Sequence, residues 1–149
     1  VGMVEIGRRA GFERVIGFDM GGTSTDVALC DGEYPRRSEV RIGGTRLQTP
    51  ALDVHTVAAG GGSILRFEDG RFRVGPESAG AVPGPAAYGR GGPLAISDVH
   101  VLLGRLPPAR LPQVFGPRGA AALDAAVVRR RFDARAAETA GATGAATPA

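Results

Sequence analysis

Lysine and asparagine are absent from the 149-residue chain, so all 18 of its basic residues are arginine. A P-loop needs a lysine that reaches the β- and γ-phosphates of a nucleotide, so P-loop chemistry is excluded within this chain. Protein-kinase chemistry is disfavoured for the same reason. Tryptophan is also absent, and aromatic residues make up only 5% of the chain. This composition predicts a modest hydrophobic core.

The chain has a single cysteine, Cys30, and no long apolar run. One cysteine excludes both an internal disulfide and a multi-cysteine zinc site. No apolar stretch approaches the roughly 20 residues that are needed to span a bilayer, and the N-terminus lacks the layout of a signal peptide. We therefore expect a cytoplasmic protein without a membrane partner.

The net charge of +3 raises the possibility of a nucleic-acid partner. Such a binder clusters its basic residues on one face and usually interleaves them with aromatic residues. Here acidic residues are mixed with the arginines through most of the chain, apart from the run at 129–131. Solvated arginine explains the charge better, and we expect no nucleic-acid partner.

The chain holds 24 glycines and 11 prolines, residues that mark tight turns rather than long helices. With the length, they predict one domain at 1–132 with large irregular loops. A disordered tail is expected at 133–149, because that segment is rich in Ala, Thr and Gly and has no periodicity. Apolar periodicity predicts the helices, and β-branched runs beside turn residues predict the strands. The expected helices span 1–11, 96–106 and 119–132, and the expected strands lie at 15–19, 26–30, 40–42, 48–57, 64–67 and 71–74. The last two strands are expected to form a hairpin with Asp69-Gly70 as its turn.

Two of these helices have distinct sequence signals. In the first, Met3, Ile6 and Ala10 fall at i, i+3 and i+7 and form the predicted apolar face, and Gly11 is a natural terminator of the helix. At the start of the helix at 96–106, Ser97 or Asp98 is the expected cap.

The most informative segment combines two short strands with a glycine turn between them. A phosphate group needs backbone amides that point into one concavity with no Cβ in the way, and Gly21 and Gly22 at a strand-to-strand turn provide both. The hydroxyls of Thr23, Ser24 and Thr25 can add hydrogen bonds to phosphate oxygens. The segment therefore predicts a phosphate-binding hairpin.

Two aspartates flank this turn. Asp19 lies at the end of the first strand and Asp26 at the start of the second, where they can hold or orient a Mg²⁺-bound water. The spacing alone is explained equally well by an ordinary hairpin with a Gly-Gly turn and two solvent-facing aspartates.

Three further groups are candidates for a site. Asp53 and His55 are two residues apart, so on a strand they share one face and could bind a metal or move a proton, although a structural pair is commoner. The glycines at 60–62 favour close approach to a nucleotide or substrate, because three glycines cost backbone entropy on folding. Arg90 could hold a phosphate or carboxylate, and a salt bridge is an equal alternative. His100 is expected at the surface or in the core.

Several blocks, in this order along the chain, resemble the hydantoinase A/5-oxoprolinase family. The first also resembles the phosphate motif of the actin, Hsp70 and sugar-kinase ATPase superfamily. Two positions depart from the family pattern: Ala87 stands where the family usually has cysteine, and the surroundings of Asp98 differ. The blocks are FDMGGTSTDVAL (18–29), DVHTV (53–57), AGGGS (59–63), VGPESAG (74–80), PGPAAYGRGG (83–92) and LLGRL (102–106).

The resemblance implies an α/β fold, with residues 1–132 forming part of an actin-like ATPase lobe on an RNase-H-like sheet. It implies that ATP, with Mg²⁺, drives the opening of a small cyclic amide such as 5-oxoproline or a hydantoin. Asp19, Asp26 and His55 would be catalytic, and Asp19, Asp53 and His55 would be metal ligands. The nucleotide would contact Gly21, Gly22, Thr23, Ser24, Thr25, Gly60, Gly61 and Gly62.

Because family members have a first hairpin near the N-terminus, this one resembles the second. The chain is then expected to be a fragment, inactive alone, whose partners are the missing first lobe of the same protein and a hydantoinase B-type subunit or domain. Two alternatives stay open: a subunit of an ATP-dependent ketone carboxylase, and a non-catalytic remnant lobe.

Overall fold

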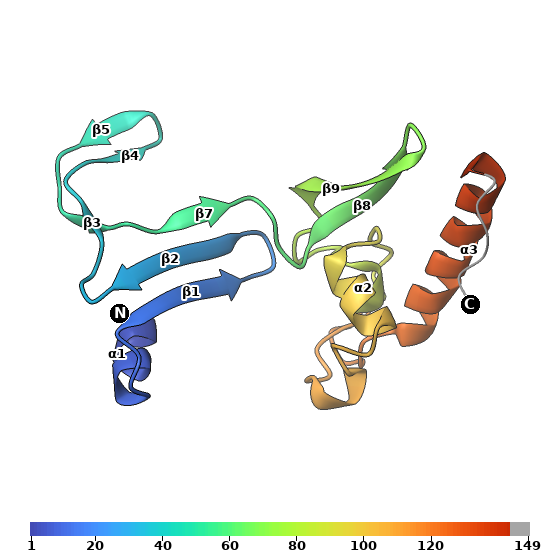
Figure 1. Cartoon of the computed structure of the whole chain (residues 1–149). Helices are drawn as coiled ribbons and strands as arrows, with labels where there is room; N and C mark the ends of the chain where they lie inside the picture. The colour runs from blue at the N-terminus through green and yellow to red at the C-terminus, as the bar shows by residue number, and fades with distance from the viewer. Residues whose placement is uncertain (144–149) are drawn as a thin grey trace.

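The computed structural model describes residues 1–143, with side chains to residue 140. It is a mixed α/β structure in which an N-terminal sheet region and a C-terminal helical region lie side by side (Figure 1). The elements are α1 (Gly2–Arg9), β1 (Arg14–Met20), β2 (Thr25–Asp31), β3 (Arg36–Arg37), β4 (Val40–Ile42), β5 (Thr45–Leu47), β6 (Ala51–Leu52), β7 (His55–Val57), β8 (Ser63–Glu68), β9 (Arg71–Ser78), η1 (Ala86–Tyr88), α2 (Ile96–Leu102), η2 (Pro108–Arg110) and α3 (Ala125–Thr143).

The N-terminal region is built on a three-stranded antiparallel sheet with the order β1-β2-β7. Helix α1 packs on one face of this sheet. A Cβ added to Gly7 would lie 2.7 Å from the Val15 side chain, so the absence of a side chain there lets the helix approach the strand.

The buried face of α1 differs from the one predicted. Val4 and Gly7 are buried, whereas Ile6 is 70% exposed. The face of Met3, Ile6 and Ala10 is therefore not the buried one, since both Ile6 and Ala10 are exposed. The periodicity rule assumes that a large side chain must fill the contact, and here the contact is made by a glycine.

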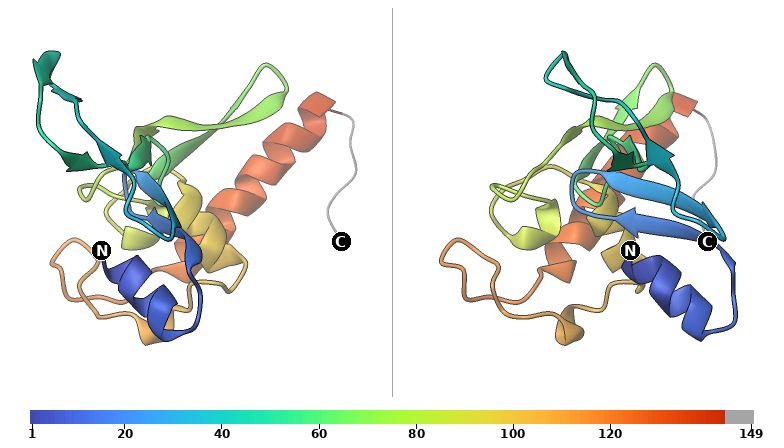
Figure 2. Two further views of the ribbon diagram at one scale, coloured as in Figure 1. Left: turned by 60° about the vertical axis from the view of Figure 1, so that its left-hand side comes forward. Right: turned by 90° about the vertical axis from the view of Figure 1, so that its left-hand side faces the viewer.

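Between β2 and β7 the chain makes two small antiparallel pairs, β3 with β6 and β4 with β5. Figure 2 shows the β4–β5 pair projecting from the rest of the molecule. The strand expected at 48–57 is divided into the short strands β6 and β7.

Strands β8 and β9 form the predicted hairpin with its turn at Asp69 and Gly70. Gly70 has φ of +74°, a conformation that glycine adopts at little cost. Phe67 and Phe72, one on each strand, pair edge to face with ring centroids 5.0 Å apart. The hairpin is joined to the loop before α2 by a hydrogen bond of 2.9 Å from the Leu65 amide to the Leu94 carbonyl.

The hydrophobic core lies in the C-terminal region. Its buried cluster consists of Ala87, Val101, Leu123 and Val128, which brings η1, α2 and α3 together. The rings of Tyr88 and Phe115 pack against this cluster with centroids 4.8 Å apart. Ala87 is thus a core residue, only 1% exposed.

The last helix corrects the expected end of the domain. Helix α3 begins at Ala125 and continues to Thr143, and the Val127 amide donates to the Asp124 carboxylate at its start over 2.8 Å. The predicted helix at 119–132 is displaced, and the predicted disorder at 133–143 is wrong. The remainder of that predicted tail, 144–149, lies outside the described residues. Of the helices in the described part of the chain, none is long and apolar enough to cross a membrane.

Candidate functional site

The tip of the β1–β2 hairpin is formed by residues 21–24. The Gly21 amide donates to the Ser24 carbonyl over 2.8 Å, which closes the turn. By contrast, the amides of Gly22, Thr23 and Ser24 donate to no acceptor within residues 1–143. The hydroxyls of Thr23 and Ser24 are likewise without a partner there. The tip therefore offers several unused donors in one short segment.

Among the residues that the structure describes, nothing requires position 22 to be glycine. Its φ lies outside the left-handed region, and a Cβ added to it would meet nothing within 4 Å. Neither backbone strain nor packing against the rest of the chain explains the residue. The space beside the tip is open to a ligand atom.

Asp19 and Asp26 are direct partners across the β1–β2 ladder. Opposite residues of an antiparallel pair project from the same face of the sheet, so the structure brings these two carboxylates together beside the tip. Both residues are exposed. Asp26 also accepts a hydrogen bond of 2.7 Å from the hydroxyl of Thr56, its partner on β7.

The second glycine loop, at 60–62, packs directly on the hairpin tip. The amides of Gly61 and Gly62 donate to the carbonyls of Gly21 and Gly22 over 2.9 and 2.6 Å, and the Gly60 amide donates to the Ser63 hydroxyl over 3.0 Å. All three amides are therefore used inside the protein. The predicted contact of Gly60, Gly61 and Gly62 with a nucleotide therefore has no free amide among these three to use, and it stays a prediction.

The close approach that these glycines suggested is made to the hairpin backbone. A Cβ on Gly60 would lie 2.8 Å from the Gly21 and Gly22 carbonyl oxygens, and a Cβ on Gly62 would lie 2.8 Å from that of Gly22. The loop packs against the tip. It also links the tip to the C-terminal region, because the Gly61 carbonyl accepts a hydrogen bond from the Ser97 amide over 2.7 Å.

Thr25 also has a structural role that differs from the one predicted. Its side chain is buried, and its hydroxyl donates to the Ala59 carbonyl over 2.5 Å. That hydroxyl holds the second glycine loop in place and is not available to a phosphate oxygen. The hydroxyls of Thr23 and Ser24 remain the candidates.

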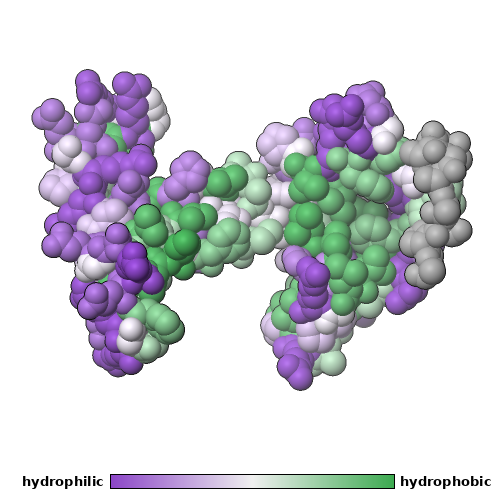
Figure 3. All heavy atoms as spheres, viewed as in Figure 1, coloured by the Kyte–Doolittle hydropathy of each residue, from purple (hydrophilic) through white to green (hydrophobic). Residues whose placement is uncertain are grey.

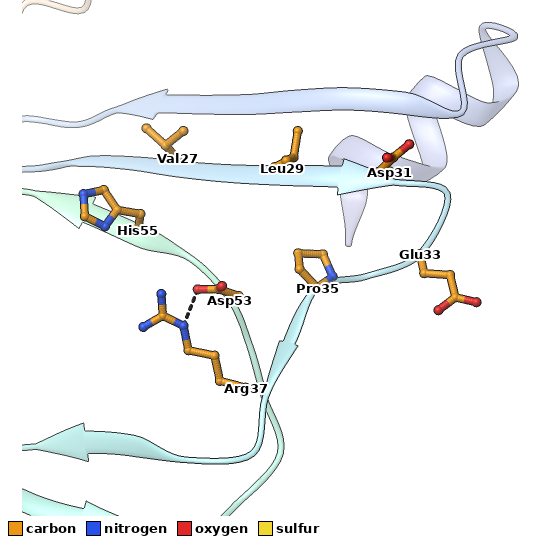
Figure 4. Close-up of a pocket in the computed structure, with 8 residues that line it drawn as sticks. All are labelled: Val27, Leu29, Asp31, Glu33, Pro35, Arg37, Asp53 and His55. Carbon is orange, nitrogen blue, oxygen red and sulfur yellow. Dashed lines mark ion pairs between the residues drawn. The ribbon is translucent and has the colours of Figure 1, made fainter.

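Asp53 and His55 lie away from the two aspartates of the hairpin. His55 is the ladder partner of Val27, whereas Asp26 is the partner of Thr56, so His55 projects from the opposite face of the sheet. Asp53 forms an ion pair with Arg37 at 2.5 Å (Figure 4).

The predicted metal set of Asp19, Asp53 and His55 is therefore not assembled. Among the residues that the structure describes, no group of three His, Cys, Asp or Glu side chains could hold a metal ion. The spacing of Asp53 and His55 did predict a shared side of the sheet, and both line a groove of about 370 Å³ along β2. Whether His55 projects from the same face as Asp19 depends on how β7 pairs with β2, and the sequence does not reveal that pairing.

Two hollows flank the hairpin tip, with volumes of about 180 and 410 Å³. Both are lined by Gly22, Tyr88 and Ser97, and the larger one is also lined by His100 and Arg105. Sequence reasoning assigned no ligand role to Tyr88, Ser97 or Arg105 and placed His100 at the surface or in the core. A sequence signal exists for three of these residues. Tyr88 lies in the family block at 83–92, Arg105 lies in the block at 102–106, and His100 lies just before that block.

The loop that carries Tyr88 is fixed by a buried carboxylate. Asp98 is fully buried and accepts amide hydrogen bonds from Ala87, Ala95 and Ala86 over 2.7, 2.8 and 3.0 Å. Burial raises the pKa of Asp98 above its ordinary value, an effect that outweighs the lowering by these amides and by Arg131. The residue caps α2 from inside the first turn, at the third helical position, and orients η1 at the same time.

Within residues 1–143, Arg90 forms no ion pair with a carboxylate. Its guanidinium donates to the carbonyls of Gly116, Val114 and Ala81 over 2.9, 3.1 and 3.3 Å. The Arg90 side chain therefore stabilises the irregular loops. It forms neither of the two predicted interactions, binding of a ligand anion or a salt bridge.

The fold and this site define a class: a mixed α/β segment in which a glycine hairpin with two paired carboxylates is supported by a second glycine loop. The sequence model of the hydantoinase/oxoprolinase family matches residues 1–147. The chain belongs to the hydantoinase/oxoprolinase family.

Individual relatives agree. The chain is 53% identical over 119 residues to 5-oxoprolinase 1 of Arabidopsis thaliana, which is 80% of this chain and 9% of that protein. The structure is similar to a nucleotide-free acetone carboxylase, with a TM-score of 0.70, 32% identity, and coverage of 96% of this chain and 20% of the other. It is also similar to the ATP-dependent caprolactamase of Pseudomonas jessenii, with a TM-score of 0.72, 32% identity, and coverage of 93% and 20%.

Proposed function

We propose that the chain is part of an ATP-dependent cyclic amide hydrolase, and that the hairpin tip at 21–24 binds the phosphate groups of ATP. The observation that carries this proposal is the combination of unused amides at Gly22, Thr23 and Ser24 with the open space beside Gly22. Consecutive backbone amides that face a concavity are a common anion site. The proposal includes an actin-like ATPase lobe as the fold to which this segment belongs.

Mg²⁺ fits the two carboxylates beside the tip. This ion is usually bound by one or two carboxylates together with substrate phosphates and water. Asp19 and Asp26 therefore suffice as its protein ligands, whereas a metal held by protein groups alone would need more. When bound, Mg²⁺ supplies positive charge that neutralises the phosphate oxygens. Asp26 is kept in position for this role by its hydrogen bond from Thr56.

The proposed reaction uses ATP to activate the amide. The terminal phosphoryl group moves to the amide oxygen and ADP leaves; water then adds to the ring carbon, the C–N bond opens and phosphate is released. Phosphoryl transfer depends mainly on positioning and charge neutralisation. In this reaction, Gly22 and Thr23 of this chain hold the phosphates, and Asp19 and Asp26 orient the attacking group.

The chain spans about a tenth of the length of the curated 5-oxoprolinase relatives that it matches. We therefore place the complete catalytic cleft in a larger assembly that includes a first lobe and a hydantoinase B-type subunit or domain. The exposed apolar face of the β1-β2-β7 sheet, where Ile16 and Phe18 are each 70% exposed, supports the packing of further polypeptide there. Cytoplasmic location belongs to the same proposal.

A ketone carboxylase subunit is the second candidate, and the likeness to the acetone carboxylase structure favours it. Both candidates use ATP, so they differ in the compound that stimulates ATP turnover.

The test is ATP hydrolysis by the longest polypeptide that carries this chain, with 5-oxoproline, a hydantoin or acetone with bicarbonate. A cyclic amide should stimulate turnover, and Asp19→Ala should reduce it at least about a hundredfold, as expected for loss of a group that acts on transition-state charge. Glu13→Ala, an exposed acid before β1 and away from the tip, is the matched control. Normal turnover by Asp19→Ala would show that the site is assigned wrongly, and stimulation by acetone alone would favour the carboxylase.

A further inference from the structure

The larger hollow beside the hairpin tip differs in its charge from the rest of the site. It has a volume of about 410 Å³ and lies between the tip and α2. Its lining residues include Tyr88, Ser97, His100 and Arg105, whose side chains carry hydrogen-bond donors, and none of its lining residues is acidic. A hollow with a permanent cation and several donors but no carboxylate favours an anion.

The two basic side chains of this hollow are not used inside the protein. Neither the Arg105 guanidinium nor the His100 ring has a hydrogen bond or ion pair within the described part of the chain. Other arginines near the site differ in this respect, since Arg90 donates to three carbonyls and Arg131 donates to the Gly92 carbonyl. Arg105 thus keeps its bidentate donor surface available for a ligand.

The backbone holds these two residues next to each other. The His100 carbonyl accepts hydrogen bonds from the Arg105 and Leu106 amides over 2.9 and 3.0 Å. This turn at the end of α2 passes through Gly104, which has φ of +69°, a conformation that a residue with a side chain rarely adopts. The fold therefore holds the backbone of Arg105 beside the hollow.

We propose that Arg105, assisted by His100 and Ser97, forms an anion subsite next to the hairpin tip, which binds a carboxylate or phosphate group of a ligand. This proposal deepens the proposed function and rests on it for the ligand's identity. The Gly22 backbone lines the hollow, so an anion held there lies beside the phosphates at the tip. A cyclic amide that carries a carboxylate is then preferred to an uncharged ring, unless the anion is itself a phosphate of the nucleotide.

The experiment is isothermal titration of the longest polypeptide that carries this chain with three separate probes: inorganic phosphate, 5-oxoproline, and 2-pyrrolidone, which is the same ring without the carboxylate. Arg105→Gln is compared with Arg110→Gln, an exposed arginine on η2 that lies outside the hollow and has no side-chain partner among the described residues. Circular dichroism checks that both variants stay folded.

We expect Arg105→Gln to weaken the binding of at least one anion by about tenfold or more, because charge-assisted hydrogen bonds are lost. Arg110→Gln should change binding by less than about twofold, the small effect expected of a remote exposed charge. An effect on 5-oxoproline alone assigns the anion to the substrate carboxylate, and an effect on phosphate alone assigns it to the nucleotide.

Three results would overturn the subsite: neither anion binds the wild-type chain, Arg105→Gln binds both as well as the wild type does, or Arg110→Gln weakens binding equally. A change in 2-pyrrolidone binding as large as that for 5-oxoproline would also contradict it. These titrations contain no ATP, so they can succeed while the Asp19→Ala turnover test fails, or fail while it succeeds. The two proposals are therefore separable.

Discussion

The N-terminal sheet region and the C-terminal helical region of this chain use their apolar residues differently. In the C-terminal region, Val128 is fully buried and the cluster around it joins two helices and a 3-10 turn. In the N-terminal region, Ile16, Phe18 and Leu29 stand 59–70% exposed on one face of the sheet. Figure 3 shows apolar surface over β1 and β2 and a narrow connection between the two regions.

This difference shows that the candidate site and the hydrophobic core lie in different regions of the chain. The β1–β2 hairpin, which carries the most informative sequence signal, lies in the region with little core of its own. Its shape is maintained by backbone hydrogen bonds from the glycine loop at 60–62, which is anchored in the C-terminal region. The helical region thus supports the site and the sheet region presents it.

The largest expected effect is in the C-terminal region, at Asp98. Asn in its place would keep one acceptor and turn an NH₂ group toward an amide donor, leaving the buried amide of either Ala87 or Ala95 without an acceptor, whereas the Ala86 amide also donates to the Pro93 carbonyl. We expect Asp98→Asn to lower the free energy of unfolding by about 3–4 kcal/mol, measured by urea denaturation. Asp124→Asn, at the start of α3, should change it by less than about 0.5 kcal/mol, because Asn caps helices as well as Asp.

Asp98 also has a signature in pH. Burial raises its pKa above the ordinary 3.8, so the folded state holds this proton more tightly than the unfolded state does. The stability that this group contributes is present below about pH 3.8 and is lost as pH rises through the raised pKa. The wild type should therefore lose stability relative to Asp98→Asn over that interval, and an opposite slope would contradict the assignment.

An intermediate effect is expected at the junction of the two regions. A methyl group at Gly60 would meet the carbonyls of Gly21 and Gly22 at 2.8 Å, so Gly60→Ala should cost about 1–3 kcal/mol. Hydrogen exchange should become faster at the amides of Gly61 and Gly62, which donate to the hairpin. Gly22→Ala meets no atom within 4 Å and should leave both stability and exchange nearly unchanged.

The smallest effect is expected on the exposed sheet face. Phe18→Ser should change the free energy of unfolding by less than about 0.5 kcal/mol, as surface substitutions usually do. Val128→Ala in the core should cost about 2 kcal/mol, since it removes buried methyl groups. Equal effects of the two substitutions would remove the contrast between the regions.

The sequence predicted the elements whose signals are local. The β8–β9 hairpin follows from Asp69 and Gly70 at its turn, and the β1–β2 hairpin follows from two β-branched runs around Gly21 and Gly22. The order of the family blocks predicted the family, which the comparison confirmed.

What the sequence could not supply are relations between distant segments. Nothing local indicates that Gly61 and Gly62 donate to the hairpin tip, or that His55 projects from the face opposite Asp19. The extension of α3 to Thr143 was missed because an Ala-rich segment without apolar periodicity resembles a disordered tail, although alanine has the highest helix propensity.

The central claim is that the hairpin tip binds nucleotide phosphate through its unused amides. The most direct test is the dissociation constant of Mg-ADP for the longest polypeptide that carries this chain, compared between the wild type and Gly22→Ala. A methyl group there meets nothing within the protein but would occupy the space of a phosphate oxygen. We predict at least about tenfold weaker binding, as loss of one good hydrogen bond to a charged group implies, with unfolding unchanged. Equal affinity of the two proteins for Mg-ADP would contradict the claim.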